Sequence, residues 1–209
     1  MMYNTTSRKE MQDSLEKTRR MIAYCYAIEN GFRADKTVDS ISKLDPELGV
    51  AFYAAKSFYN LRPQFAKIYL SMCESTEKMI ETLLDLDIFE DSDDKSELIS
   101  NIDENPNIDT FKVVGHFIDI TGQNAKMFEI LALNLRCVCK PEGWYSREYA
   151  LNTIKMIDED LYNMVNVLID RGYDEVIDVL IEHFGKLANG FKEIFDKFGP
   201  KREMFRPKR

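Results

Sequence analysis

Apolar side chains recur three and four positions apart along most of this chain of 209 residues, and strand-like alternation is almost absent. Because an α-helix has 3.6 residues per turn, this spacing gathers the apolar side chains on one helix face. The most regular row comes last, with Ile177, Leu180, Phe184, Leu187, Phe191, Ile194 and Phe198. The pattern predicts an all-α fold in which helices bury such rows against one another.

Capping residues set the bounds of the first predicted helix. Ser7 and Glu10 match the Ser-x-x-Glu capping box, and Gly31 offers a left-handed stop. The apolar row expected between them consists of Met11, Leu15, Thr18, Ile22, Cys25 and Tyr26. We therefore expect a helix between these capping signals that buries this row.

In the half of the chain after the acidic residues, Gly122 predicts a break in one helix and Ser146 predicts the start of another. Gly122 lies inside a helix expected over about 109–138, and an interior glycine costs about 1 kcal/mol relative to alanine. We therefore expect a kink or break near Gly122. Ser146 is expected to cap a single helix that runs to Gly172, because its apolar row continues over that whole length.

The acidic segment 85–109 is the best candidate for a linker, since it holds ten acidic residues and one basic residue. We expect three long helices before this segment and three after it. Short loops make sequential helices antiparallel neighbours, which predicts an up-and-down bundle of about six principal helices with short connecting helices. Residues 1–198 then form one helical-bundle domain with the acidic segment between its two three-helix halves.

The C-terminal residues have the opposite charge. The whole chain has a net charge of -8, yet six bases and only one acid occupy residues 197–209. Gly199 and Pro200 stop the last helix, so we expect 199–209 to be a flexible basic tail. The tail residues expected to bind a partner are Lys201, Arg202, Phe205, Arg206, Lys208 and Arg209. The acidic segment offers partner-binding residues of opposite charge at Glu90, Asp91, Asp93 and Asp94.

Residues with catalytic or metal-binding potential form no complete motif. Neither His116 nor His183 follows a glutamate by three positions, as a di-iron bundle requires, so both are expected to be structural or surface residues. Cys137 and Cys139 are too closely spaced for a typical zinc site. Asp178 and Glu182 share a helix face and are weak candidates for a divalent metal. We expect no cofactor, and the solvated face of an amphipathic helix is the simpler interpretation of these two acids.

The remaining features concern compartment and partners. Four cysteines, two of them inside apolar helical patterns, favour free thiols in a reducing compartment. The polar N-terminal residues do not form a secretory signal, and no apolar run is long enough to span a bilayer. We therefore expect a cytoplasmic protein that makes no membrane contact.

Three functional interpretations remain open. The leading one is a non-enzymatic adaptor or regulatory protein, forming a homo-oligomer, that binds another protein through its helical faces and its oppositely charged segments. The second is a nucleic-acid-associated accessory factor, in which the basic tail meets the phosphate backbone. The third is a metal-dependent hydrolase that uses helix carboxylates. The tail can also serve only as a solubilising segment, or meet the acidic segment of the same or another subunit.

Overall fold

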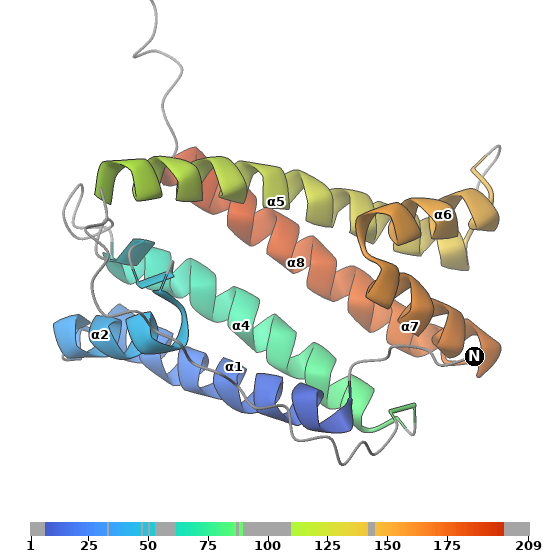
Figure 1. The fold of residues 1–209 in the computed structure, drawn as a ribbon, viewed down its shortest axis with the longest axis horizontal. Coiled ribbons are helices and arrows are strands. Elements are labelled where there is room, and N and C mark those ends of the chain that lie inside the picture. Colours follow the sequence, from blue (N-terminus) through green and yellow to red (C-terminus); the bar gives the residue numbers. More distant parts are fainter. Residues whose placement is uncertain are drawn as a thin grey trace, which may run out of the picture.

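A computed structural model describes residues 7–32, 34–46, 48–49, 51–52, 62–86, 88–89, 110–141 and 145–198. Its helices are α1 (Arg8–Glu29), α2 (Ala34–Leu44), α4 (Arg62–Leu84), α5 (Thr110–Cys139), α6 (Arg147–Ile157), α7 (Glu159–Asp170) and α8 (Asp174–Phe198). Figure 1 shows the long helices packed side by side, with the short ones at the two ends. The predicted all-α helical bundle is confirmed.

The first helix begins and ends where the capping residues predict. The Ser7 side chain accepts a hydrogen bond from the Glu10 backbone N–H at 3.2 Å, and the Ser7 backbone N–H donates to the Glu10 carboxylate at 2.7 Å. Gly31 follows α1 with a φ of 75°, a left-handed conformation that glycine adopts without a Cβ penalty. Local sequence therefore fixes both ends of α1.

The four long helices are neighbours in the order α1, α4, α8, α5 (Figure 1). α4 packs against both α1 and α8, and α8 packs against both α4 and α5. Within the described residues, α5 touches neither α4 nor α1. Sequential helices are neighbours across short loops, but the long acidic connection between α4 and α5 allows α8 to take the place between them.

The helix expected from Ser146 to Gly172 is two helices, because α6 ends at Ile157 and α7 begins at Glu159. Asp158 between them is extended, with φ -151° and ψ 104°, and its carboxylate accepts a hydrogen bond from the Leu161 backbone N–H at 2.9 Å. The prediction of a single helix is therefore wrong. A carboxylate that satisfies a backbone donor of the next helix stabilises the break.

The break expected near Gly122 does not occur, since α5 is one helix over 30 residues. The ring of Phe195 on α8 lies against Gly122, and a Cβ added at this glycine would come within 3.0 Å of the ring. Glycine thus permits a close approach of α8. The packing of α8 at this point offsets the low helix propensity of Gly122.

The buried apolar residues form two clusters, and each includes residues from both sides of the acidic segment. One cluster is centred on α5 to α8 and includes Leu83 of α4. The other is centred on α1, α2 and α4 and includes Ile194 of α8. The buried row of α1 is Met11, Met21, Cys25 and Ile28, whereas Tyr26 is 58% exposed. The row predicted for α1 was therefore wrong at Tyr26, because α2 and α4 together cover a face turned away from it.

Candidate interaction groove

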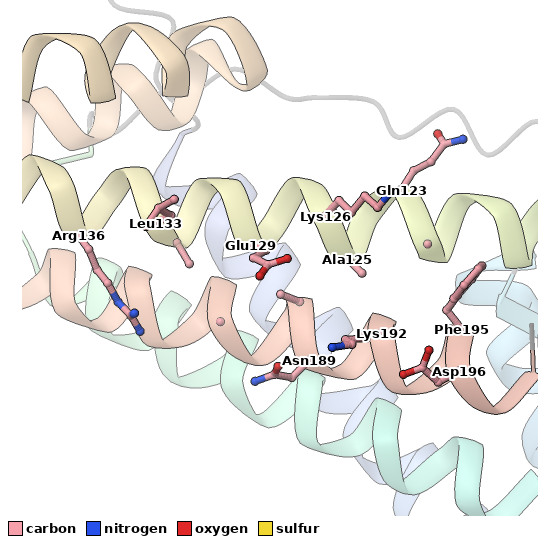
Figure 2. A pocket seen from close by; sticks show the side chains of 14 residues that line it. Gln123, Ala125, Lys126, Glu129, Leu133, Arg136, Asn189, Lys192, Phe195 and Asp196 are labelled. Atoms are coloured by element: carbon pink, nitrogen blue, oxygen red, sulfur yellow. The ribbon is translucent and has the colours of Figure 1, made fainter. Parts of the chain in front are cut away.

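A groove of about 870 Å³ runs between α5 and α8, which lie in opposite directions (Figures 1 and 2). From α5 it is lined by residues between Gly122 and Arg136, and from α8 by residues between Gly185 and Asp196. In Figure 2 the Phe195 ring stands at one end of the groove and Arg136 at the other. The groove therefore extends along several turns of both helices.

The spacing of the lining residues explains why the groove follows the helices. On both α5 and α8 the lining positions recur at three and four residues, so each helix contributes one continuous face. Several of these positions hold small residues, namely Gly122, Ala125, Ala132, Gly185 and Ala188. Ala132 and Ala188 are buried, so they form part of the floor. Small side chains along this edge of the helix pair leave the space that larger ones would fill.

An aromatic stack holds α5 and α8 together. Phe128 of α5 stacks with Phe184 and Phe191 of α8, with ring centroids 5.8 and 5.6 Å apart. Parallel rings at such distances attract one another beyond the effect of their buried area. None of these three rings lines the groove. The two walls of the groove are therefore held in place by contacts that a ligand in the groove would not disturb.

Two large apolar side chains stand in the groove and are open to solvent. Leu133 of α5 is 54% exposed and Phe195 of α8 is 37% exposed. Ile130, beside Leu133 on α5, is 43% exposed. When another molecule covers water-exposed apolar side chains of this size, the free energy falls by about 25 cal/mol per Å² of apolar surface that is buried. The groove therefore offers apolar surface in a concave site.

Charged side chains surround this apolar surface. Lys126, Glu129 and Arg136 of α5 and Lys192 and Asp196 of α8 line the groove, and all five are exposed. Figure 2 shows Glu129 and Arg136 reaching from α5 towards α8. No ion pair involves any of these five in the described part of the chain. The groove is thus lined by three cations and two carboxylates.

His183 lies outside the groove, in the contact between α8 and α4. Its side chain is 5% exposed, and its Nδ1 is 3.3 Å from the Ser75 hydroxyl of α4. Burial, together with the nearby Lys186 ammonium, lowers the pKa of His183 to about 4. The imidazole is therefore neutral at pH 7 and packs as a polar group between two helices. The side chain of the second histidine, His116, lies outside the described residues.

The two carboxylates that the sequence offers as weak metal candidates are in different surroundings. Glu182 binds Lys186 at 3.0 Å and Lys78 at 3.1 Å, and these two ammonium groups lower its pKa. Asp178 is exposed one turn earlier on α8. The described residues contain no group of three or more potential metal ligands. A metal at Glu182 would have to displace two lysines.

The cysteines are free thiols in the structure. Cys25 of α1 is fully buried beside Cys73 of α4, and hydrogen bonding to Cys73, with burial, raises the pKa of Cys25. Cys139, near the end of α5, also has a raised pKa, first through burial and then through Asp178. Raised pKa values keep both thiols protonated at pH 7, which makes them weak nucleophiles.

The residues of the two charged segments that the sequence proposes as binding sites lie outside the described residues. They comprise Glu90, Asp91, Asp93 and Asp94 in the acidic segment, and Lys201, Arg202, Phe205, Arg206, Lys208 and Arg209 in the basic tail. None of the predicted binding residues is among the described residues that line the groove. A second row on α8, in which Gly185, Ala188 and Lys192 recur beside the apolar row, is the signal that could have indicated it.

Comparison of the chain with protein-family models, with curated proteins and with solved structures finds no match. Among the described helices, none combines the length and the apolar character that crossing a membrane requires.

Proposed function

We propose that this protein is a non-enzymatic interaction protein that binds another protein, with the groove between α5 and α8 as its principal contact surface. The observation that carries the proposal is the combination, in one concave site, of exposed Leu133 and Phe195 with five charged side chains that form no ion pair within the described residues. Protein interfaces combine an apolar centre with a polar rim in this way.

The basic segment 199–209 follows directly in the chain on α8, which forms one wall of the groove. Phe195 and Asp196 lie within the last turn of α8, so a partner at that end of the groove is within reach of the segment that follows. We assign Lys201, Arg202, Phe205, Arg206, Lys208 and Arg209 a supporting role in attachment. The acidic residues Glu90, Asp91, Asp93 and Asp94 have the same role towards basic surfaces.

The proposal is tested by affinity capture from an extract of the native host. The full chain, a variant with Leu133→Ala and Phe195→Ala, and a chain lacking residues 199–209 are each immobilised. We expect the full chain to retain a defined set of proteins, the double variant to lose them, and the shortened chain to hold them less well as salt increases.

Two outcomes would contradict the proposal. One is a retained set that is the same for the full chain and the double variant. The other is retention that disappears after nuclease treatment, which would favour the nucleic-acid interpretation instead. Circular dichroism of each variant shows whether the helical fold is intact, so a loss of binding can be separated from a loss of structure.

A further inference from the structure

We infer that the groove between α5 and α8 binds an amphipathic α-helix of the partner protein, and that carboxylates flank the apolar face of this helix. The inference rests on the proposed function and names the chemistry of the partner. It follows from three properties of the groove: its length and floor, the positions of its apolar side chains, and the charges along its walls.

The length and floor of the groove suit a helix. From Gly122 to Arg136 the α5 wall spans 14 residue steps, which is about 21 Å at 1.5 Å per residue. A helix of about 14 residues has the same length. Glycine and alanine on the floor, among them Gly185 and Ala188, allow a third helix to approach to the usual interaxial distance of about 8–10 Å. Binding a helix in a groove between helices is a common mode of peptide recognition.

The exposed apolar side chains define the pattern that the bound helix must carry. Phe195 lies against Gly122 of α5. Gly122 precedes Leu133 by 11 residues, so this is also the separation of the two apolar side chains along α5. Eleven residues of helix correspond to about 16 Å, or three turns. A bound helix with apolar residues at positions i, i+4, i+7 and i+11 meets both side chains with one face.

The charges in the groove define what flanks that face. Arg136, Lys126 and Lys192 are the three cations, and each lacks an ion pair within the described residues. Carboxylates on the bound helix would pair with them, and arginine in particular binds a carboxylate through two parallel hydrogen bonds. Glu129 and Asp196 also line the groove. A nucleic acid carries a negative charge on every nucleotide, and these two acids repel that continuous charge. A peptide helix can instead place its carboxylates opposite the three cations alone, so the groove favours an acidic peptide over a nucleic acid.

The first experiment selects ligands without assuming a partner. A display library of helical peptides of about 18 residues, randomised on every face, is selected against the full chain. We expect enriched peptides with apolar residues at i, i+4, i+7 and i+11 and a net negative charge. Enrichment of basic or non-helical peptides, or no enrichment, would overturn the inference.

The second experiment locates the binding site of the best enriched peptide by fluorescence anisotropy. Gly185→Leu places a side chain in the groove, and a Cβ at Gly185 meets no atom within 4 Å, so the helix remains intact. We expect this variant to weaken peptide binding by about tenfold or more. Peptide affinity unchanged by Gly185→Leu would overturn the inference.

Charge reversal tests the electrostatic part with a matched control. Arg136→Glu should weaken binding of the acidic peptide, and a peptide with lysine in place of the facing carboxylate should restore it. Lys17→Glu makes the same change in net charge on the exposed face of α1, away from the groove, and should leave the affinity unchanged. Equal losses for both variants would show attraction by overall charge and overturn the specific pairing.

Native capture with Gly185→Leu separates this inference from the proposed function. If the native proteins still bind when the peptide does not, the groove is not their contact surface. The helix inference and the role of the groove in the proposed function then fail, and protein binding through another surface stands. If the peptide binds the groove but no native protein is ever retained, the proposed function is wrong. A single-stranded oligonucleotide that displaces the peptide at lower concentration than unlabelled peptide would reassign the groove to nucleic acid.

Discussion

The helix pairs α1–α4 and α5–α8 differ in what occupies their exposed edges. At the α1–α4 edge, Arg19 binds Glu77 at 2.8 Å and Glu81 at 2.6 Å, so charged side chains bridge the two helices. Arg8 also reaches across to the Leu84 carbonyl at 3.1 Å. At the α5–α8 edge, lysines, an arginine and two carboxylates line the groove, and none of them forms an ion pair within the described residues.

A helix pair can therefore be well packed at its centre whether or not side chains bridge its exposed edge. Both pairs bury regular apolar rows, and Phe128, Phe184 and Phe191 join α5 to α8. Small residues such as Ala125 and Gly185 then leave the α5–α8 edge hollow. A pair can therefore be firmly held at its centre and still present an open edge to another molecule.

The largest expected effect comes from removing the centre of the α5–α8 contact. Phe128→Ala deletes a ring that stacks on two others, and we expect it to lower the free energy of unfolding by about 3 kcal/mol. Urea unfolding followed by circular dichroism measures this change. Arg19→Ala is the comparison at the α1–α4 edge, and its effect should be much smaller because the ion pairs are exposed. Similar effects for the two variants would contradict the distinction between centre and edge.

Acid should weaken the contact between α4 and α8 through His183. Above pH 6.5 this imidazole is neutral in both the folded and the unfolded chain. Below pH 6.5 the unfolded chain takes up a proton that the folded chain does not accept until about pH 4, so stability falls as the pH drops through this window. The loss attributable to His183 is about 3 kcal/mol.

Urea unfolding at pH 7, 5 and 4 measures this loss. Carboxylates also titrate in this range, so the informative quantity is the difference from His183→Gln, which keeps a polar group near Ser75 and does not titrate. We expect the wild-type chain to lose more stability than this variant. If the stability of both chains fell equally with pH, unfolding would involve no proton uptake by His183, and its pKa would be the same in the folded and unfolded chains.

The smallest expected effect distinguishes two glycines on opposite sides of the groove. Gly185→Ala should raise the free energy of unfolding by up to about 1 kcal/mol, because its Cβ meets no neighbour and alanine favours the helix. Gly122→Ala should raise the free energy of unfolding by less, since its Cβ would lie 3.0 Å from the Phe195 ring. Thermal unfolding of both variants measures the difference. An equal gain would mean that the Phe195 ring moves away at little cost.

The ends of helices could be predicted from sequence because caps are local. Ser7, Gly31, Ser146 and Gly172 all act within a few residues of where they stand. The break at Asp158 was missed because the apolar row continues across it, with Ile154 before and Leu161 after, both buried. Periodicity alone does not distinguish one helix from two that bury the same row.

The groove could not be predicted because it depends on which helices become neighbours. α5 packs on α8, which begins 35 residues after α5 ends, and spacing within either helix carries no information about this choice. The exposure of Leu133 has the same origin, since its position on α5 is apolar in sequence and becomes a groove wall only once α8 is in place.

The central position of α8 has a consequence for the order in which this protein assembles during synthesis. α8 joins α4 to α5, yet it leaves the ribosome after all the other described helices. α1 and α4 can pair as soon as both have emerged. Until α8 emerges, α5 has only α6 beside it among the described helices. A nascent chain stalled before residue 174 should therefore expose the inner face of α5, a natural target for chaperones that hold unfinished polypeptides.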